Sequence, residues 1–133
     1  MNRVFADSFY FFAVLSPKDR MHQKAREFAT RHKGAIVTTA WVLTELADGL
    51  AVTAHRAAVS RLIARLEAEP DNEIVPPSEE LMTRGIELYG ARPDKQWSLT
   101  DCISFVVMQE YGLTEALTGD HHFEQAGFRA LLK

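Results

Sequence analysis

The chain has 133 residues, 47% of them hydrophobic and 25% charged, which predicts one globular domain over residues 1–133 with a core of its own. Residues 1–15 are largely apolar but contain Asp7, are too short to span a bilayer and have no small-residue cleavage site, so we expect a cytoplasmic protein with no membrane segment. The single cysteine, Cys102, excludes an internal disulfide and a cysteine-based zinc site. The net charge of −3 is at odds with a generally basic surface that would bind nucleic acid.

The chain is expected to open with a buried strand and two helices. Residues 3–6 are a short apolar run before Asp7, which is typical of a buried strand, and Ser8 can cap the helix that follows. Over residues 18–33 apolar side chains recur at three- and four-residue steps, which predicts an amphipathic helix ended by Gly34. This segment carries six basic and two acidic side chains, a surplus of 6 − 2 = +4, and as a group it is a candidate for holding a nucleic-acid backbone.

A second strand and a helical hairpin are expected next. Residues 35–37 form another short apolar run, and either Thr38 or Thr39 can cap the helix after it. The helical period then continues to Pro70 with a bend near Gly49, which predicts two packed helices.

The middle of the chain continues the alternation of strand and helix. Residues 73–75 predict a weak third strand, and Ser78 begins a helix that runs to a loop at residues 90–98. Ser98 and Asp101 have the spacing of a capping box, in which each side chain bonds the backbone of the other residue at a helix start.

The last third of the chain predicts the centre and one edge of the fold. Residues 102–108 are apolar on nearly every side, as expected of a helix buried in the domain centre. A fourth strand is expected at 115–118, a short helix after Asp120, and an edge strand at 128–132. Strands that alternate with helices predict a three-layer α/β fold, with a mainly parallel central sheet flanked by helices. Ligands of such sheets bind beyond the carboxyl ends of the strands.

Four acidic side chains lie where these elements turn inward. Asp7 and Asp120 follow strands, Glu45 lies in a helix whose other positions face the core, and Asp101 begins the buried helix. Each alone is explained as a cap, a turn residue or a surface carboxylate, but together they offer the oxygen ligands that suit Mg²⁺, an ion that stabilises charge on a phosphoryl group. Thr118 adds a hydroxyl that can hold a ligand or water. With four acids set aside, the remaining charge is 15 − 14 = +1, so a nucleic-acid substrate is not excluded.

Four segments carry a resemblance to a known family. VFADSFYFFA, TTAWVLTELADGL, DKQWSLTDCISFVVM and ALTGDHHF, in this order and spacing, resemble PIN domains and most of all the VapC-type toxins of toxin–antitoxin systems. The resemblance covers essentially the whole chain. It implies a PIN fold and endoribonuclease activity that depends on Mg²⁺ or Mn²⁺. It also implies catalytic roles for five residues, namely Asp7, Glu45, Asp101, Asp120 and Thr118. The four acidic residues among them would hold the metal.

The resemblance further implies three partners: an RNA substrate, a cognate antitoxin protein and a second copy of the chain. Apolar positions in the segments 52–66 and 78–90 exceed what a small core needs, which adds to the expectation of a homodimer.

Other polar residues near these motifs have ordinary interpretations. Asp94 and Lys95 match the family pattern, and we interpret them as loop structure or RNA contacts rather than metal ligands. Because neighbouring helix positions point to different sides, His121 and His122 are expected to be surface groups. Cys102 is expected to be a small buried hydrophobic residue rather than a nucleophile.

Two alternative functions stay open. A Mg²⁺-dependent phosphatase or phosphoacceptor domain also places an aspartate after its first strand, but the halo-acid type of phosphatase needs a second aspartate where this chain has Phe9. A catalytically silent PIN-fold module that binds proteins would keep the acids only for stability. Clustered carboxylates repel one another without a cation, which makes such a role unfavourable.

Overall fold

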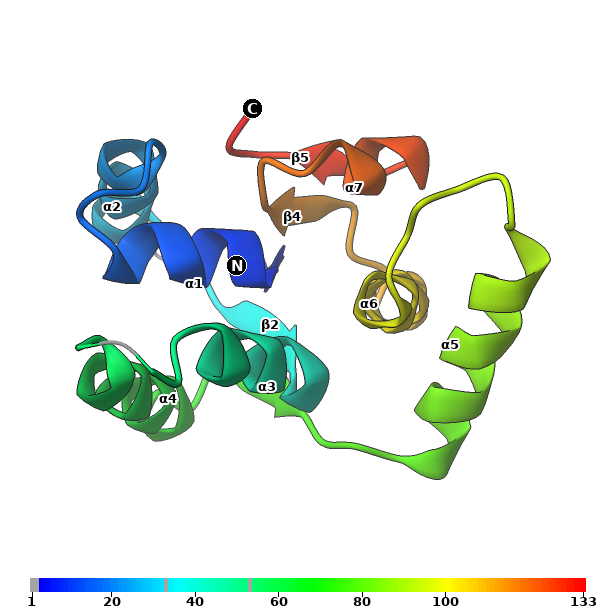
Figure 1. Ribbon diagram of the computed structural model, residues 1–133, viewed down its shortest axis with the longest axis horizontal. Coiled ribbons are helices and arrows are strands. Elements are labelled where there is room, and N and C mark those ends of the chain that lie inside the picture. The colour runs from blue at the N-terminus through cyan, green and yellow to red at the C-terminus, as the bar shows by residue number, and fades with distance from the viewer. Residues whose placement is uncertain (1–2, 33, 53) are drawn as a thin grey trace.

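The centre of the molecule is a sheet of five strands, all parallel to their neighbours, in the order β3-β2-β1-β4-β5. The computed structural model describes residues 3–32, 34–52 and 54–133, and it places helices around this sheet (Figure 1). The expected α/β fold with a mainly parallel sheet is therefore confirmed. The strands are β1 Val4–Ala6, β2 Ile36–Thr39, β3 Glu73–Val75, β4 Glu115–Leu117 and β5 Arg129–Ala130.

The strands are short and apolar because both faces of the sheet are covered, as parallel sheets require. β1 lies at the middle of the sheet, paired with β2 through Val4 and Ile36 and with β4 through Phe5 and Ala116. All three residues of β1 are buried. Because the strands run in one direction, the residues that follow β1, β2 and β4 emerge at the same edge of the sheet.

Seven helices connect the strands in the described part of the chain, and their starts follow the predicted capping residues in three cases. Thr39 accepts a hydrogen bond from the backbone of Val42 at 3.1 Å, and Ser78 accepts one from Leu81 at 3.1 Å. Ser98 begins its helix with the predicted capping box. The helices are α1 Ser8–Leu15, α2 His22–Arg31, α3 Ala40–Gly49, α4 Arg56–Ala68, α5 Glu79–Ala91, α6 Leu99–Glu110 and α7 His121–Gln125.

Several predicted boundaries in the first half of the chain are wrong. α1 has Asp7 at its N-cap position, so Ser8 is its first residue rather than its cap. α2 begins at His22 instead of residue 18, because Asp19 stabilises a turn by accepting a hydrogen bond from the backbone of Met21 at 2.8 Å. The predicted end of this helix at Lys33 lies outside the described residues.

Other predicted boundaries shift where local pattern and packing disagree. The predicted helical hairpin is present as α3 and α4, but the helical period is interrupted between them, since α3 ends at Gly49, Val52 lies in a turn and is 98% exposed, and α4 begins at Arg56. α5 runs on to Ala91, so the loop after it starts later than residue 90. β2 extends to Thr39, two residues past the predicted end, because the sheet pairs Thr39 with Val75.

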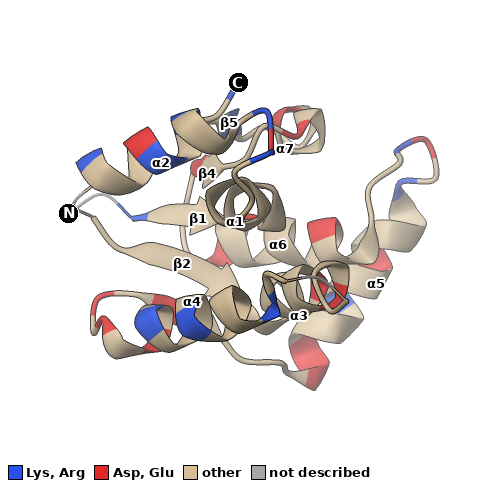
Figure 2. Cartoon of the chain, turned by 60° about the vertical axis from the view of Figure 1, so that its left-hand side comes forward, with Lys and Arg blue, Asp and Glu red and all other residues tan. Residues whose placement is uncertain are grey.

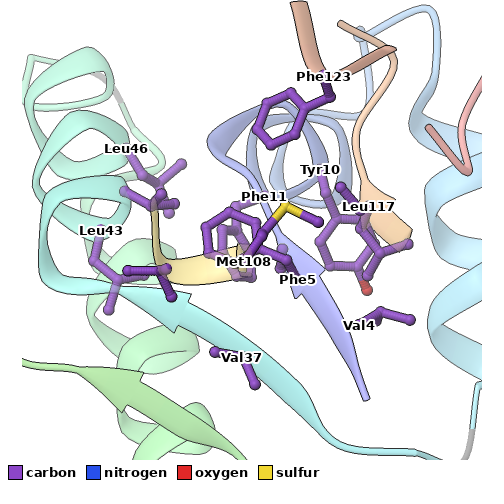
Figure 3. Close-up of a cluster of buried hydrophobic side chains, with 14 of the residues drawn as sticks. Val4, Phe5, Tyr10, Phe11, Val37, Leu43, Leu46, Met108, Leu117 and Phe123 are labelled. Carbon is purple, nitrogen blue, oxygen red and sulfur yellow. The ribbon is translucent and has the colours of Figure 1, made fainter. Parts of the chain in front are cut away.

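The core gathers around α6, as its uniformly apolar sequence predicted. All seven residues from Cys102 to Met108 are buried, and Cys102 is the small buried residue that was expected. Figure 3 shows Met108 of α6 beside Phe5 of β1, Phe11 of α1 and Leu117 of β4. The C-terminal half of α6 therefore packs into the same core as α1, β1 and β4.

The surface carries charge unevenly. Figure 2 shows Lys and Arg along α2 and α4, and Asp and Glu on α5. On α2, Lys24 donates to the carbonyl of Lys133 and Arg31 lies 3.7 Å from Glu27. Within the described ranges, no helix is long and apolar enough to cross a bilayer.

Candidate active site

Asp7 is the most buried acid of the candidate site. It follows β1 directly and is only 4% exposed. Its Oδ2 accepts a hydrogen bond from Oγ1 of Thr118 at 2.9 Å, so the carboxylate faces the end of β4 rather than capping α1. Its pKa is raised from 3.8 to about 7, mainly by burial; the nearby charges of Asp101 and Glu45 contribute to the increase, and the hydrogen bond from Thr118 opposes it.

Thr118 joins two of the predicted site residues. It is fully buried after β4, where its hydroxyl donates to Asp7 and accepts from the backbone nitrogen of Asp120 at 3.0 Å. Asp120 then caps α7, its Oδ1 accepting from the backbone nitrogen of His122 at 2.9 Å. One hydroxyl therefore fixes the ends of β1 and β4 relative to each other.

Asp101 combines a structural and an electrostatic role. Its Oδ2 accepts from the backbone nitrogen of Ser98 at 3.1 Å, while its own nitrogen donates to Oγ of Ser98 at 3.0 Å. Burial raises the pKa of this carboxyl, and the negative charge of Asp120 adds to the increase. The capping box therefore holds a desolvated carboxylate in one orientation at the start of α6.

Glu45 reaches the same region from α3. Oγ of Ser8 donates to its Oε1 at 2.5 Å. From the sequence we expected Ser8 to cap α1, and the contact between Ser8 and Glu45, which are 37 residues apart, was not predicted. A serine directly after a site aspartate was the available signal, but helix capping explained it equally well.

The four predicted acids thus come together at the end of the sheet. The charge of Asp7 is coupled to those of Asp101 and Glu45, and the charge of Asp101 to that of Asp120. Like charges in a desolvated place repel, and a cation relieves this repulsion. Their roles as metal ligands and catalytic residues stay predictions, as does the supporting role of Thr118.

The loop before α6 contains an ion pair. Asp94 accepts two hydrogen bonds from Arg92, at 2.9 and 3.0 Å, and it lies 4.0 Å from Nζ of Lys95. The hydrogen bond from Arg92 lowers the pKa of Asp94 to about 2. These contacts fit the interpretation of Asp94 and Lys95 as loop structure.

The two histidines do not point to different sides as expected. Nδ1 of His122 lies 3.1 Å from Oδ2 of Asp101 and 3.4 Å from Oδ1 of Asp120, and the side chain of His122 is only 17% exposed. Nδ1 of His121 lies 3.6 Å from the same oxygen of Asp120. The expectation of a surface group holds for His121, whose side chain is 63% exposed, but is wrong for His122, because both side chains lie in the first turn after Asp120 and contact its carboxylate.

Known proteins resemble this chain over almost its whole length. The PIN domain family matches residues 4–129. The curated 23S rRNA-specific endonuclease VapC20, from two strains of Mycobacterium tuberculosis, is 28% identical over 126 residues, which cover 94% of this chain and 95% of the relative.

Two solved structures share the fold. The crystal structure of VapC20 from Mycobacterium tuberculosis, a toxin that cleaves the sarcin-ricin loop, matches with a TM-score of 0.85 and 22% identity over 94% of this chain and 95% of that one. The structure of FitAcB from Neisseria gonorrhoeae matches with a TM-score of 0.67 and 17% identity over 96% of this chain and 94% of that one. The resemblance found in the sequence is confirmed, and the chain belongs to the PIN domain family.

Proposed function

We propose that this chain is a divalent-metal-dependent endoribonuclease and the toxin of a toxin–antitoxin pair. Membership of the PIN domain family and the endonuclease relatives support RNA cleavage. The observation that carries the proposal is the convergence of Asp7, Glu45, Asp101 and Asp120, with Asp7 desolvated among like charges. The same observation counts against a silent binding module, and the family match counts against a phosphatase.

The residues present fit a divalent cation. Carboxylate oxygens are the ligand atoms that Mg²⁺ and Mn²⁺ prefer. A positive charge beside Asp7 offsets both the free-energy cost of burying its carboxylate and the repulsion from Asp101 and Glu45. We assign Asp7, Glu45, Asp101 and Asp120 as the groups that hold the ion. When bound, it supplies a Lewis acid that makes water more acidic and stabilises charge on the phosphoryl group.

Hydrogen-bond donors orient three of these carboxylates in advance. Thr118 donates to Asp7, Ser8 donates to Glu45, and the backbone of Ser98 donates to Asp101. Each donor leaves further lone pairs on its carboxylate for a cation. Outer groups of this kind fix the ligands and raise metal affinity, so Thr118 acts as a positioning residue.

The test is cleavage of defined RNA by purified protein. Because the curated relatives are 23S rRNA-specific endonucleases, ribosomal RNA is the first substrate to try, with transfer RNA and messenger RNA as comparisons. Sequencing the product ends should show discrete cuts with Mg²⁺ or Mn²⁺ present. Equal cleavage by an Asp101→Asn variant purified in parallel would show that a contaminant cuts the RNA.

Two assemblies belong to the same proposal. A small antitoxin protein would silence the enzyme in the cytoplasm, and an arginine of that partner can pair bidentately with the site carboxylates in competition with the metal. The chain would also form a homodimer. Met82, Ile86 and Tyr89 support this assembly, because they lie along one side of α5 and are 38%, 50% and 55% exposed.

A further inference from the structure

The histidines of α7 form a cluster that the proposed carboxylate site does not use. Ligand atoms of Asp120, His121 and His122 all lie within 4.8 Å of one another. Within the described part of the chain, this is the one set of three acidic, histidine or cysteine side chains that meets so closely. The two imidazole rings have centroids 4.5 Å apart.

The positions of the two imidazoles differ in a way that suits ligand binding. His122 is largely buried and lies between two carboxylates, with Nδ1 3.1 Å from Asp101 and 3.4 Å from Asp120. His121 is 63% exposed, and its Nδ1 lies 3.6 Å from the same Asp120 oxygen that His122 contacts. The buried imidazole fixes one side of the cluster, and the exposed one leaves it open to solvent.

The chemistry of the donors distinguishes this cluster from the carboxylate site. Imidazole nitrogen is a good ligand for Zn²⁺, Co²⁺ and Ni²⁺, whereas Mg²⁺ prefers oxygen and keeps its waters. Two nitrogens and one carboxylate oxygen therefore favour a transition-metal ion. Asp120 belongs to both sets, so an ion held by the histidines would lie beside the proposed Mg²⁺ site and share a ligand with it.

We infer that Asp120, His121 and His122 form a position for a divalent transition-metal ion such as Zn²⁺ or Co²⁺, next to the carboxylates that hold Mg²⁺. The assignment of Asp120 to the neighbouring site rests on the proposed function. The histidine contacts themselves come from the structure alone.

Metal binding to the metal-free protein, without RNA, tests this inference. Co²⁺ is the probe because nitrogen ligands change its visible absorption, and Mg²⁺ is the reference ion in calorimetric titrations. His121→Gln and His122→Gln should each weaken Co²⁺ binding by about tenfold or more, with a much smaller effect on Mg²⁺. His55→Gln, at the start of α4, is the matched control and should leave Co²⁺ binding unchanged.

A second measurement covers the case in which His122→Gln does not fold. In nitrogen-15 spectra of the wild-type protein, diamagnetic Zn²⁺ should shift the imidazole signals of His121 and His122 at one equivalent, while those of His22 and His55 stay in place. Equal affinity for Co²⁺ and Mg²⁺ in the wild type, or Co²⁺ binding that survives both substitutions, would overturn the inference. Loss of RNA cleavage in Asp101→Asn tests the proposed function separately, because it needs no transition metal.

Discussion

Replacing Asp7 by asparagine should make the metal-free protein more stable at neutral pH while abolishing RNA cleavage. The carboxyl group of Asp7 is 4% exposed and faces the like charges of Asp101 and Glu45, which together with burial bring its pKa to about 7. Asparagine keeps the shape and still offers an oxygen to the Thr118 hydroxyl, but it carries no charge to desolvate.

The size and the pH range of this effect follow from the pKa. Because the folded state holds the Asp7 proton more tightly than the unfolded state, the contribution of Asp7 to wild-type stability is greatest below pH 4 and is lost as the pH rises to about 7. The change from 3.8 to about 7 corresponds to about 4 kcal/mol at most. At pH 8 the variant should therefore unfold at a temperature higher by roughly 10 °C.

Thermal unfolding in excess chelator, followed from pH 4 to pH 8, measures the effect. The two proteins should have similar stability near pH 4 and diverge as the pH rises. Asp94→Asn is the control, since this exposed aspartate has a pKa lowered to about 2 by Arg92 and should gain no stability at pH 8. Parallel curves for wild type and Asp7→Asn across the whole range would refute the buried-charge explanation.

The remaining predictions concern metal, activity, packing and assembly. Excess chelator should stop RNA cleavage and added Mg²⁺ or Mn²⁺ restore it; full activity in chelator would exclude metal-dependent catalysis. Expression of the wild type should slow growth and expression of Asp101→Asn should not, and equal growth rates would argue against nuclease-based toxicity. Gly85→Ala should lower the free energy of unfolding by about 1–3 kcal/mol in urea titrations, because the added Cβ would lie 2.3 Å from Cγ1 of Ile103. An unchanged midpoint of urea unfolding would mean that α5 and α6 repack freely. Ile86→Asp should turn a dimer into a monomer in sedimentation, whereas a wild-type protein that is monomeric at high micromolar concentration would contradict the dimer.

The sequence alone determined much of the fold, because the relevant signals are local. Short apolar runs predicted the strands, and the caps at Thr39, Ser78 and Ser98 depend on residues only three positions away. The uniformly apolar segment after Asp101 predicted the buried helix for the same reason. Boundaries failed where a turn interrupted the pattern, as before His22 and after Gly49.

The sequence also identified the acids of the candidate site, but the groups that surround them emerged only with the tertiary structure. Ser8 meets Glu45 across 37 residues, Thr118 meets Asp7 across 111, and His122 meets Asp101 across 21. No local periodicity encodes such pairs, because they depend on how β1, α3, α6 and α7 meet at one end of the parallel sheet. The raised pKa of Asp7 has the same origin, since burial and neighbouring charges are properties of the packed chain.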